Sequence, residues 1–177
     1  MKYIVYIATS IDGYIADKVG GIEWLNTVPN PDKNDLGWSD FIKNIDAIVM
    51  GKNTFEKVLS FNMDWHYPVP TYILSNSIKE IPKGFEDKIE IINGTPKEVT
   101  ELLNNKGYNN VYVDGGTTIQ QFLKEDLIEE LIITKIPILL GGGIPLFTEL
   151  DNQMIFELIE TKVLINHLVQ IKYSRKR

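Results

Sequence analysis

Short runs of hydrophobic residues alternate with apolar residues at helical spacing along the first two thirds of the chain. Residues 2–9 and 47–50 are rich in β-branched and aromatic side chains and end at polar residues or glycine, which is typical of buried strands. Trp38, Phe41 and Ile42 recur at the spacing of an amphipathic helix. The same patterns predict strands at 71–75, 89–92, 111–113 and 131–140, and helices around 54–59, 99–103 and 119–123. Repeated strand and helix units predict an α/β fold with a largely parallel sheet covered on both faces.

The last third of the chain has no convincing helix between its final apolar runs. Residues 155–163 and 165–173 are both typical of strands, and the second alternates cleanly between apolar and polar side chains. This pattern predicts an antiparallel hairpin that closes one edge of the sheet, with Lys162 to Asn166 around its turn.

Glycine and proline interrupt residues 14–34 so often that we expect a long loop with no regular element there. A loop of that length inside a domain is usually functional or mobile.

Composition and charge restrict the class of protein. A chain of 177 residues suits one domain, so we expect residues 1–177 to form a single domain. The net charge of -6 opposes binding to nucleic acid and to anionic membranes. No apolar run reaches the roughly 18 residues of a membrane span. We therefore expect a cytoplasmic protein with a small-molecule ligand, and a solvated tail at Arg175 to Arg177.

The residues that bind metals or form disulfides are scarce in this chain. There is no cysteine, which excludes disulfides and cysteine nucleophiles. His66 and His167 lie far apart in the sequence and lack the spacing of a ligand pair, so we expect no metal site.

Residues 111–118, Val-Tyr-Val-Asp-Gly-Gly-Thr-Thr, are predicted to lead from a strand into a helix. Gly115 and Gly116 would place small backbone beside the free N–H groups of the helix, which suits a diphosphate. A tight turn with Thr117 as the helix cap is an equally good interpretation of this motif alone. The GxGxxG fingerprint is absent, so an ordinary Rossmann domain is not supported.

Two further strand ends carry residues that suit the same kind of ligand. Lys52 follows the strand at 47–50 and precedes a predicted helix, although a lysine in such a place is usually just solvated. Ser75 and Asn76 offer short hydrogen-bonding side chains at the end of another strand. Three such strand ends in one parallel sheet favour an extended anionic ligand such as a dinucleotide.

Six stretches of the chain have counterparts, in the same order, in one known family. They are residues 8–16, Trp24, and residues 48–56, 72–75, 111–116 and 137–147. On these residues the chain resembles the dihydrofolate reductase superfamily, and most closely the branch that contains the C-terminal reductase domain of the riboflavin-biosynthesis deaminase-reductase, RibD. The resemblance implies a dihydrofolate reductase-like three-layer α/β fold, with a mostly parallel central sheet and a C-terminal antiparallel hairpin. It also implies an oxidoreductase.

The resemblance implies NADPH, rather than NADH, as the cofactor. Lys52 matches the position that reads the adenosine 2′-phosphate, and Thr54 matches the helix start beside the diphosphate. In this family the glycine pair can be joined by a cis peptide. The other cofactor positions implied are Gly51 and Asn53, Ser75 and Asn76 at the adenosine, Gly115, Gly116, Thr117 and Thr118 at the diphosphate and nicotinamide, and Ala8, Ile15 and Trp24 around the nicotinamide.

Two carboxylates are candidates for the catalytic acid. Asp35 stands where dihydrofolate reductases carry their pterin-binding acid, and Asp12 stands where the riboflavin branch keeps an acidic residue. Each has a structural alternative, because Asp35 could cap a helix and Asp12 could form a turn. On this scaffold a hydride passes from the nicotinamide to an electron-poor carbon or C=N bond, and a protein acid or water supplies the proton.

The chain departs from the riboflavin branch where that branch holds a ribose phosphate. Residues 5–7 lack its usual lysine, and residues 61–67 replace its acidic and arginine cluster with aromatic residues. Residues 18–34 depart from an ordinary dihydrofolate reductase.

The expected function is therefore NADPH-dependent reduction of a flat nitrogen heterocycle in riboflavin or folate metabolism. Its substrate would resemble a pterin, dihydrofolate or 5-amino-6-(5-phosphoribosylamino)uracil. The alternative is a non-catalytic module that binds NADP(H) or a folate-like ligand. The resemblance is compatible with a homodimer through the late strands, which nothing in the spacing demands.

Overall fold

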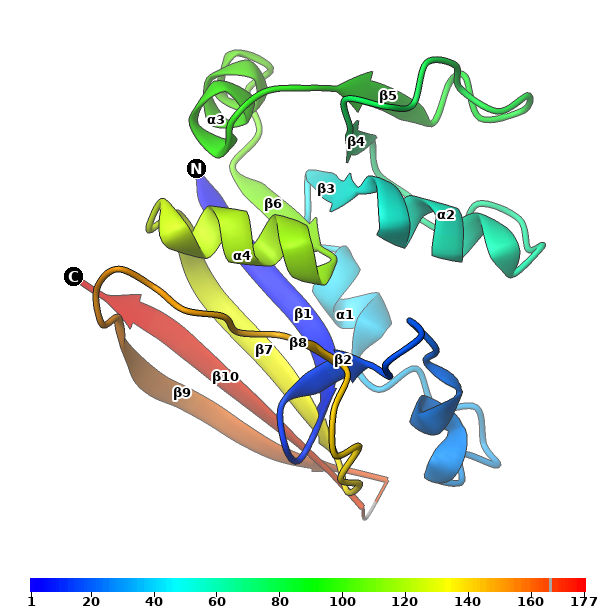
Figure 1. Ribbon diagram of the computed structural model, residues 1–177, viewed down its shortest axis with the longest axis vertical. Helices are drawn as coiled ribbons and strands as arrows, with labels where there is room; N and C mark the ends of the chain where they lie inside the picture. The colour runs from blue at the N-terminus through cyan, green and yellow to red at the C-terminus, as the bar shows by residue number, and fades with distance from the viewer. Residues whose placement is uncertain (166) are drawn as a thin grey trace.

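The computed structural model describes residues 1–165 and 167–177 and contains one large mixed sheet with helices on its two faces (Figure 1). The strands are β1 (Lys2–Ser10), β2 (Tyr14–Ala16), β3 (Ala47–Gly51), β4 (Thr71–Leu74), β5 (Ile89–Ile92), β6 (Asn110–Asp114), β7 (Ile128–Ile136), β8 (Ile144–Pro145), β9 (Ile155–Leu164) and β10 (Leu168–Lys176). The helices are the 3₁₀ turn η1 (Glu23–Thr27) and the α-helices α1 (Trp38–Ile42), α2 (Lys52–Ser60), α3 (Pro96–Asn105) and α4 (Gly116–Lys124).

Eight strands form the main sheet in the order β5-β4-β3-β6-β1-β7-β10-β9. The pairs from β5 to β7 are parallel, whereas β10 runs antiparallel to both β7 and β9. The predicted mostly parallel sheet with a C-terminal antiparallel hairpin is therefore confirmed. Among the residues that the structure describes, no helix has the length and apolar character needed to cross a bilayer.

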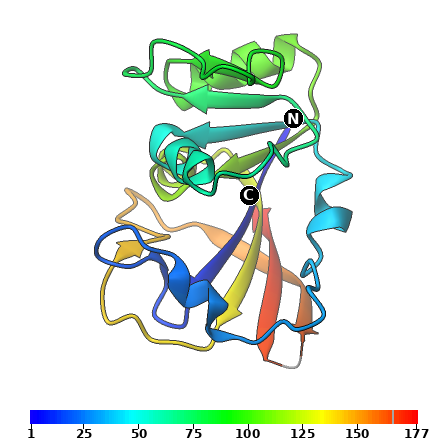
Figure 2. The ribbon, with the colours of Figure 1, turned by 90° about the vertical axis from the view of Figure 1, so that its right-hand side faces the viewer.

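The two faces of the sheet carry separate hydrophobic clusters. Neighbouring residues Ile48 and Val49 of β3 belong to different clusters, because successive side chains of a strand point to opposite faces. One cluster includes Phe122 of α4, and the other includes Ile42 of α1 and Phe55 of α2. Figure 2, turned by 90°, shows α1 in cyan on the side of the sheet away from α4 in yellow-green. Burial on both faces explains why these strands are continuous apolar runs.

Three expectations about element boundaries were wrong. Residues 14–34 contain β2 and η1, and β2 is stabilised by pairing with the distant β8, a contact that local sequence does not reveal. The strand predicted at 131–140 spans Ile128–Ile136, since the next residue, Pro137, has no N–H to donate to a neighbouring strand.

The final strand starts at Leu168 rather than at Ile165. Ile165 has a φ of 43°, which belongs to a turn and not to a strand. The last residue of the predicted turn, Asn166, lies outside the described residues.

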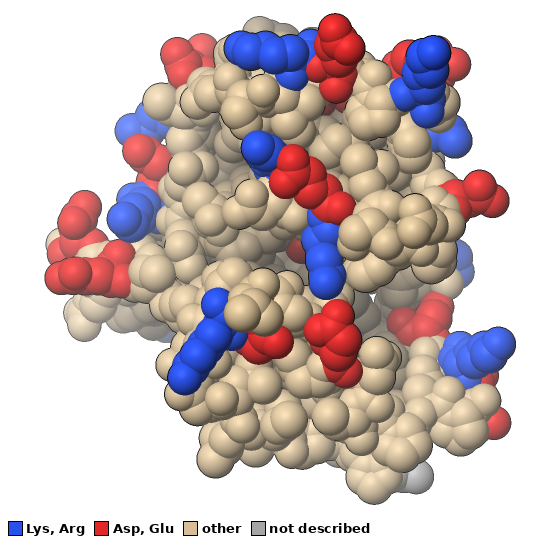
Figure 3. Space-filling view, turned by 45° about the vertical axis from the view of Figure 1, so that its right-hand side comes forward, with Lys and Arg blue, Asp and Glu red and all other residues tan. Residues whose placement is uncertain are grey.

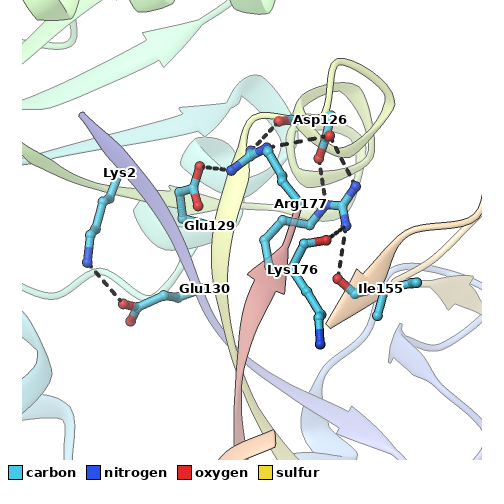
Figure 4. A network of polar contacts seen from close by, with 8 residues as sticks. Lys2, Asp126, Glu129, Glu130, Ile155, Lys176 and Arg177 are labelled. Atoms are coloured by element: carbon cyan, nitrogen blue, oxygen red, sulfur yellow. Dashed lines mark hydrogen bonds and ion pairs between the residues drawn. The ribbon is translucent and has the colours of Figure 1, made fainter. Parts of the chain in front are cut away.

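Of the three basic residues expected to form a solvated tail, Lys176 and Arg177 are exposed, whereas Arg175 is held against the fold. Arg175 donates from Nε and Nη2 to the carboxylate of Asp126, at 2.7 and 3.1 Å, and its side chain is only 10% exposed. Arg177 contacts Glu129 and donates to the Asp126 carbonyl. Figure 4 shows this network, which fixes the end of β10 against the turn that precedes β7.

Candidate functional site

A cavity of about 1140 Å³ lies where four parallel strands end, at the carboxyl edge of the sheet. Its wall is built by the ends of β1, β3, β4 and β6, by the first turns of α2 and α4, and by the loop that follows β2. Figure 3 shows a hollow between two parts of the molecule, with lysine or arginine and acidic side chains around its mouth. In open parallel sheets this edge is where ligands bind.

The first turns of α2 and α4 lie against each other in this wall. A Cβ added to Gly51 would lie 2.8 Å from Thr118 Oγ1, and one added to Gly115 would collide with Thr54 Oγ1. A Cβ on Gly116 would lie 2.7 Å from the side chain of Ile15. The glycines therefore let two sets of free helix N–H groups approach the same space, which suits a diphosphate.

The glycine pair combines an unusual φ angle at Gly115 with an ordinary trans peptide bond. Gly115 has a φ of 89°, a conformation that other residues rarely adopt. No cis peptide occurs among the described residues, so Gly115 and Gly116 are joined in trans and that expectation was wrong.

Of the residues expected to bind the cofactor, all but Trp24 line the large cavity. They are Ala8, Ile15, Gly51, Lys52, Asn53, Thr54, Ser75, Asn76, Gly115, Gly116, Thr117 and Thr118. Trp24 is instead buried, 7% exposed, in a cluster with Ile136 and Leu168. Its place in η1 turns the indole into that cluster and away from the cavity wall, a direction set by tertiary packing.

The charged side chains that line the cavity are mostly cationic. Lys18, Lys52 and Lys57 line it, against Glu56 and Asp114. The Nζ atom of Lys52 lies 3.6 Å from Glu56 on the next turn of α2, and Lys57 lies 3.7 Å from Glu23. These ion pairs are solvent-exposed and therefore weak, so a bound phosphate could replace the glutamate partners.

A smaller cavity of about 300 Å³ adjoins the large one. The two share Tyr6, Ile7, Ala8 and Leu25 in their walls. Asp35 lines the smaller cavity, together with Asn26, Asn30, Thr134 and several apolar residues. The shared residues place the two cavities side by side.

Asp35 lies at the start of α1 and also lines the smaller cavity. Its carboxylate accepts hydrogen bonds from the backbone N–H groups of Gly37 and Ser39, each at 3.0 Å, at the start of α1. Hydrogen bonds from Ser39 and Gly37 hold the pKa of Asp35 below its usual value, so the group is ionised at neutral pH. It is both a helix-start acceptor and a charged wall residue.

Asp12 lies outside both cavities. Its carboxylate accepts from the backbone N–H groups of Leu140 and Gly141, at 3.1 and 2.8 Å, and joins the β1–β2 turn to the glycine-rich loop after β7. Hydrogen bonds from the Ser10 side chain and from these N–H groups lower the pKa of Asp12. The arrangement corresponds to the turn-forming alternative.

Asp114 is a site residue that the sequence interpretation did not single out. It ends β6 directly before the glycine pair, lines the large cavity, and accepts from the Gly115 N–H at 2.8 Å. Burial raises the pKa of Asp114 to about 6, although hydrogen bonds from Gly115 and Tyr112 oppose the shift. A carboxylate at a strand end beside two glycines was the available signal, but its desolvation depends on the folded chain around it, where Tyr67 lies close enough for the Asp114 charge to raise the tyrosine pKa.

Within residues 1–165 and 167–177, no group of three or more histidine, aspartate or glutamate side chains is placed to hold a metal ion.

Comparisons with known proteins point to one family. A family model described as the RibD C-terminal domain matches residues 2–170. YwjB of Bacillus subtilis (strain 168), an uncharacterized protein, is 36% identical over 177 residues, which cover 98% of each chain. A candidate riboflavin biosynthesis protein from Shewanella sp. PV-4 is 51% identical, with a TM-score of 0.96 and 100% of both chains covered.

More distant solved structures share the fold. The diaminohydroxyphosphoribosylaminopyrimidine deaminase/5-amino-6-(5-phosphoribosylamino)uracil reductase of Thermotoga maritima has a TM-score of 0.76 at 14% identity, covering 99% of this chain and 56% of that one. The dihydrofolate reductase of Enterococcus faecalis, solved with NADP(H), has a TM-score of 0.66 at 16% identity, covering 99% and 97%. The expected dihydrofolate reductase-like fold is thereby confirmed.

Proposed function

Because the chain belongs to the RibD C-terminal domain family, we propose that it is an NADPH-dependent reductase of a flat nitrogen heterocycle. The observation that carries the proposal is the pair of adjoining cavities at the carboxyl edge of the sheet. The larger has room and cationic side chains for a dinucleotide, and the smaller has room for one ring system. Their shared wall at Ala8 would bring the two ligands into contact.

The residues of the large cavity fit NADPH. Gly115, Gly116 and the first turn of α2 would hold the diphosphate, since the absence of a Cβ lets the Gly115 backbone approach Thr54 at the start of α2 and brings both helix starts to the cavity. Lys52 would bind the adenosine phosphate, with Ser75 and Asn76 at the adenosine end. When bound, NADPH would supply the hydride, and the protein would orient the rings and exclude water.

In this proposal Asp35 binds the substrate ring and Asp114 supplies the proton. The Asp35 carboxylate, ionised and facing the smaller cavity, would accept N–H groups of the substrate ring. Asp114 lines the large cavity, not the smaller one; with a pKa of about 6 it would hold a proton close to the working pH and supply it to a substrate ring that reaches across the shared wall. Asp12 would hold the loop beside the site and would take no part in proton transfer.

Calorimetric titration with NADPH and NADH tests the cofactor assignment. We expect NADPH to bind more tightly, and Lys52→Ala to weaken NADPH binding about tenfold with little effect on NADH. Lys43→Ala is the matched control, because Lys43 forms an exposed pair with Asp40 on α1 and does not line either cavity.

Two outcomes would change the proposal. No heat with millimolar NADPH would reject it. Tight NADPH binding without oxidation across a broad panel of pterins and pyrimidines would support the non-catalytic binding module instead.

The homodimer stays a prediction. Exposed apolar side chains of β9 offer a surface for it, since Ile155, Leu158, Ile159 and Val163 are each more than half exposed, with values from 55% to 68%. Light scattering on the purified protein, with Leu158→Lys for comparison, would measure whether that edge joins two copies.

A further inference from the structure

We propose that the substrate of this protein carries no phosphate or carboxylate group, so that the smaller cavity selects a heterocycle with an uncharged substituent. The inference rests on the proposed reductase function and adds the class of substrate. It follows from how charged side chains are divided between the two cavities.

The smaller cavity contains one charged side chain among the described residues that line it, and that charge is negative. Asp35 is the charged residue. The remaining lining residues are Tyr6, Ile7, Ala8, Leu25, Asn26, Val28, Asn30, Leu36, Thr134, Ile136, Ile165 and Leu168. A phosphate placed here would lose part of its hydration and find no cation among the residues of this wall, since the nearby Lys43 pairs with Asp40 outside the cavity.

Two polar side chains of this wall, Tyr6 and Thr134, are already engaged in hydrogen bonds. Gln170 donates from Nε2 to Thr134 Oγ1 at 3.0 Å and to the Tyr6 hydroxyl at 3.3 Å. The Tyr6 hydroxyl donates in turn to the Leu36 carbonyl at 2.8 Å. These groups form a preorganised neutral surface, which suits a ring with its own donors and acceptors better than a dianion.

A lysine on the neighbouring strand does not alter this balance. Lys162 lies close enough to Tyr6 to influence its pKa, yet its Nζ atom is 2.9 Å from the carboxylate of Glu160. The pair is neutral as a unit, and neither member lines the smaller cavity.

Asp35 opposes an anionic substituent directly. It is exposed to solvent and also lines the cavity, so its charge faces the open side of this space. Its hydrogen bonds from Gly37 and Ser39 keep it ionised at neutral pH. Like charges at this short range reduce affinity even where solvent screens them.

The large cavity has several cationic side chains in its wall, in contrast to the smaller one. One protein can therefore bind a phosphorylated cofactor and an uncharged substrate. Lys18, Lys52 and Lys57 all belong to its wall and none belongs to that of the smaller cavity. In this proposal the three lysines bind the phosphates of the cofactor and none of them binds the substrate.

The test compares matched ligands that differ only in a phosphate. The protein is saturated with NADP⁺ and titrated by calorimetry with 5-amino-6-(ribosylamino)uracil and its 5-phosphate, and with neopterin and neopterin monophosphate. We expect at least one ring to bind, with the unphosphorylated member about tenfold tighter or more. Equal or tighter binding of the phosphorylated member would overturn the inference, and so would the failure of both rings to bind.

Two variants locate the effect. Asp35→Asn should reduce the difference between the paired ligands to about threefold or less, whereas Asp32→Asn, an exposed carboxylate of the same loop outside the cavity, should leave it unchanged. Asn26→Lys adds a cation to the cavity wall and should strengthen binding of the phosphorylated member severalfold. Asn104→Lys, the same change at an exposed position of α3, should not.

The failure of this inference can be told apart from failure of the reductase proposal. Binding of NADPH is measured first and separately, and its absence would reject the reductase. Normal NADPH binding together with a preference for phosphorylated ligands would reject only the substrate class.

Discussion

The two cavities share one wall but differ in the kind of side chain that surrounds them. The large cavity is bordered by helix starts, glycines and three lysines, and the smaller one by apolar groups, neutral polar groups and Asp35. Both are consequences of one parallel sheet, since strand ends bring backbone N–H groups to one edge while the flanking loops supply the rest. We infer from this difference that cofactor binding and substrate binding depend on mostly different residues. Separate substitutions should therefore weaken one without the other.

The largest expected effect is on the chemical step. Asp114→Asn should lower the rate of NADPH oxidation about 100-fold or more, because the carboxyl that holds a proton near neutral pH is lost. The rate of the unmodified protein should fall as pH rises through about 6. Stopped-flow absorbance would measure both, with Asp64→Asn, an exposed carboxylate outside both cavities, as the control. An unchanged rate would assign the proton to another group or to water.

The same variant should stabilise the protein. The pKa of Asp114 is raised from 3.8 to about 6, so keeping this group ionised disfavours the folded state above pH 6. Stability conferred by the neutral carboxyl is lost as pH rises between about 4 and 6. Asp114→Asn should therefore raise the free energy of unfolding by about 1–3 kcal/mol at pH 7 and leave it nearly unchanged below pH 4. Urea denaturation at several pH values would detect this crossover.

The next effect concerns the cofactor side alone. Gly115→Ala should weaken NADPH binding about tenfold or more and destabilise the fold by about 2 kcal/mol, because the new Cβ collides with Thr54 at a φ of 89°. Gly84→Ala is a matched control, since Gly84 has a φ of 90° and nothing within 4 Å of its added Cβ. Calorimetry and thermal unfolding would separate the two effects. Equal losses of cofactor affinity in both variants would contradict the assignment of Gly115 to the diphosphate.

The smallest expected effect comes from the loop that borders the large cavity. Lys18→Ala should weaken NADPH binding about two- to fivefold, as expected for an exposed cation near a phosphate. The effect should fade at high salt. Lys33→Ala, in the same long segment but outside both cavities, should change nothing. A loss of heterocycle affinity in Lys18→Ala would contradict the assignment of Lys18 to cofactor binding alone.

Local sequence was sufficient for the parts of the site that depend on local structure. The runs at residues 47–50 and 111–114 and the glycines that follow them reveal two strand ends and two helix starts. Once the sheet is parallel, these ends must share an edge, and the structure brings Gly51 within reach of Thr118 and Gly115 within reach of Thr54.

Other features depended on contacts between distant segments and could not be predicted. β2 exists because it pairs with β8, more than a hundred residues later in the chain. The raised pKa of Asp114 comes from its desolvation in the folded chain, where Tyr67 of a distant loop lies nearby. The direction of Trp24 was wrong for the same reason, because its cluster is completed by Ile136 and Leu168. Propensity and spacing carry no information about such contacts.

A crystal structure of the protein with NADP⁺ bound tests the central claim most directly. We expect the diphosphate between residues 51–54 and 115–118, with the nicotinamide beside Ala8 and its reactive face toward the cavity that Asp35 borders. A cofactor bound elsewhere on the molecule, or a nicotinamide turned away from that smaller cavity, would contradict it.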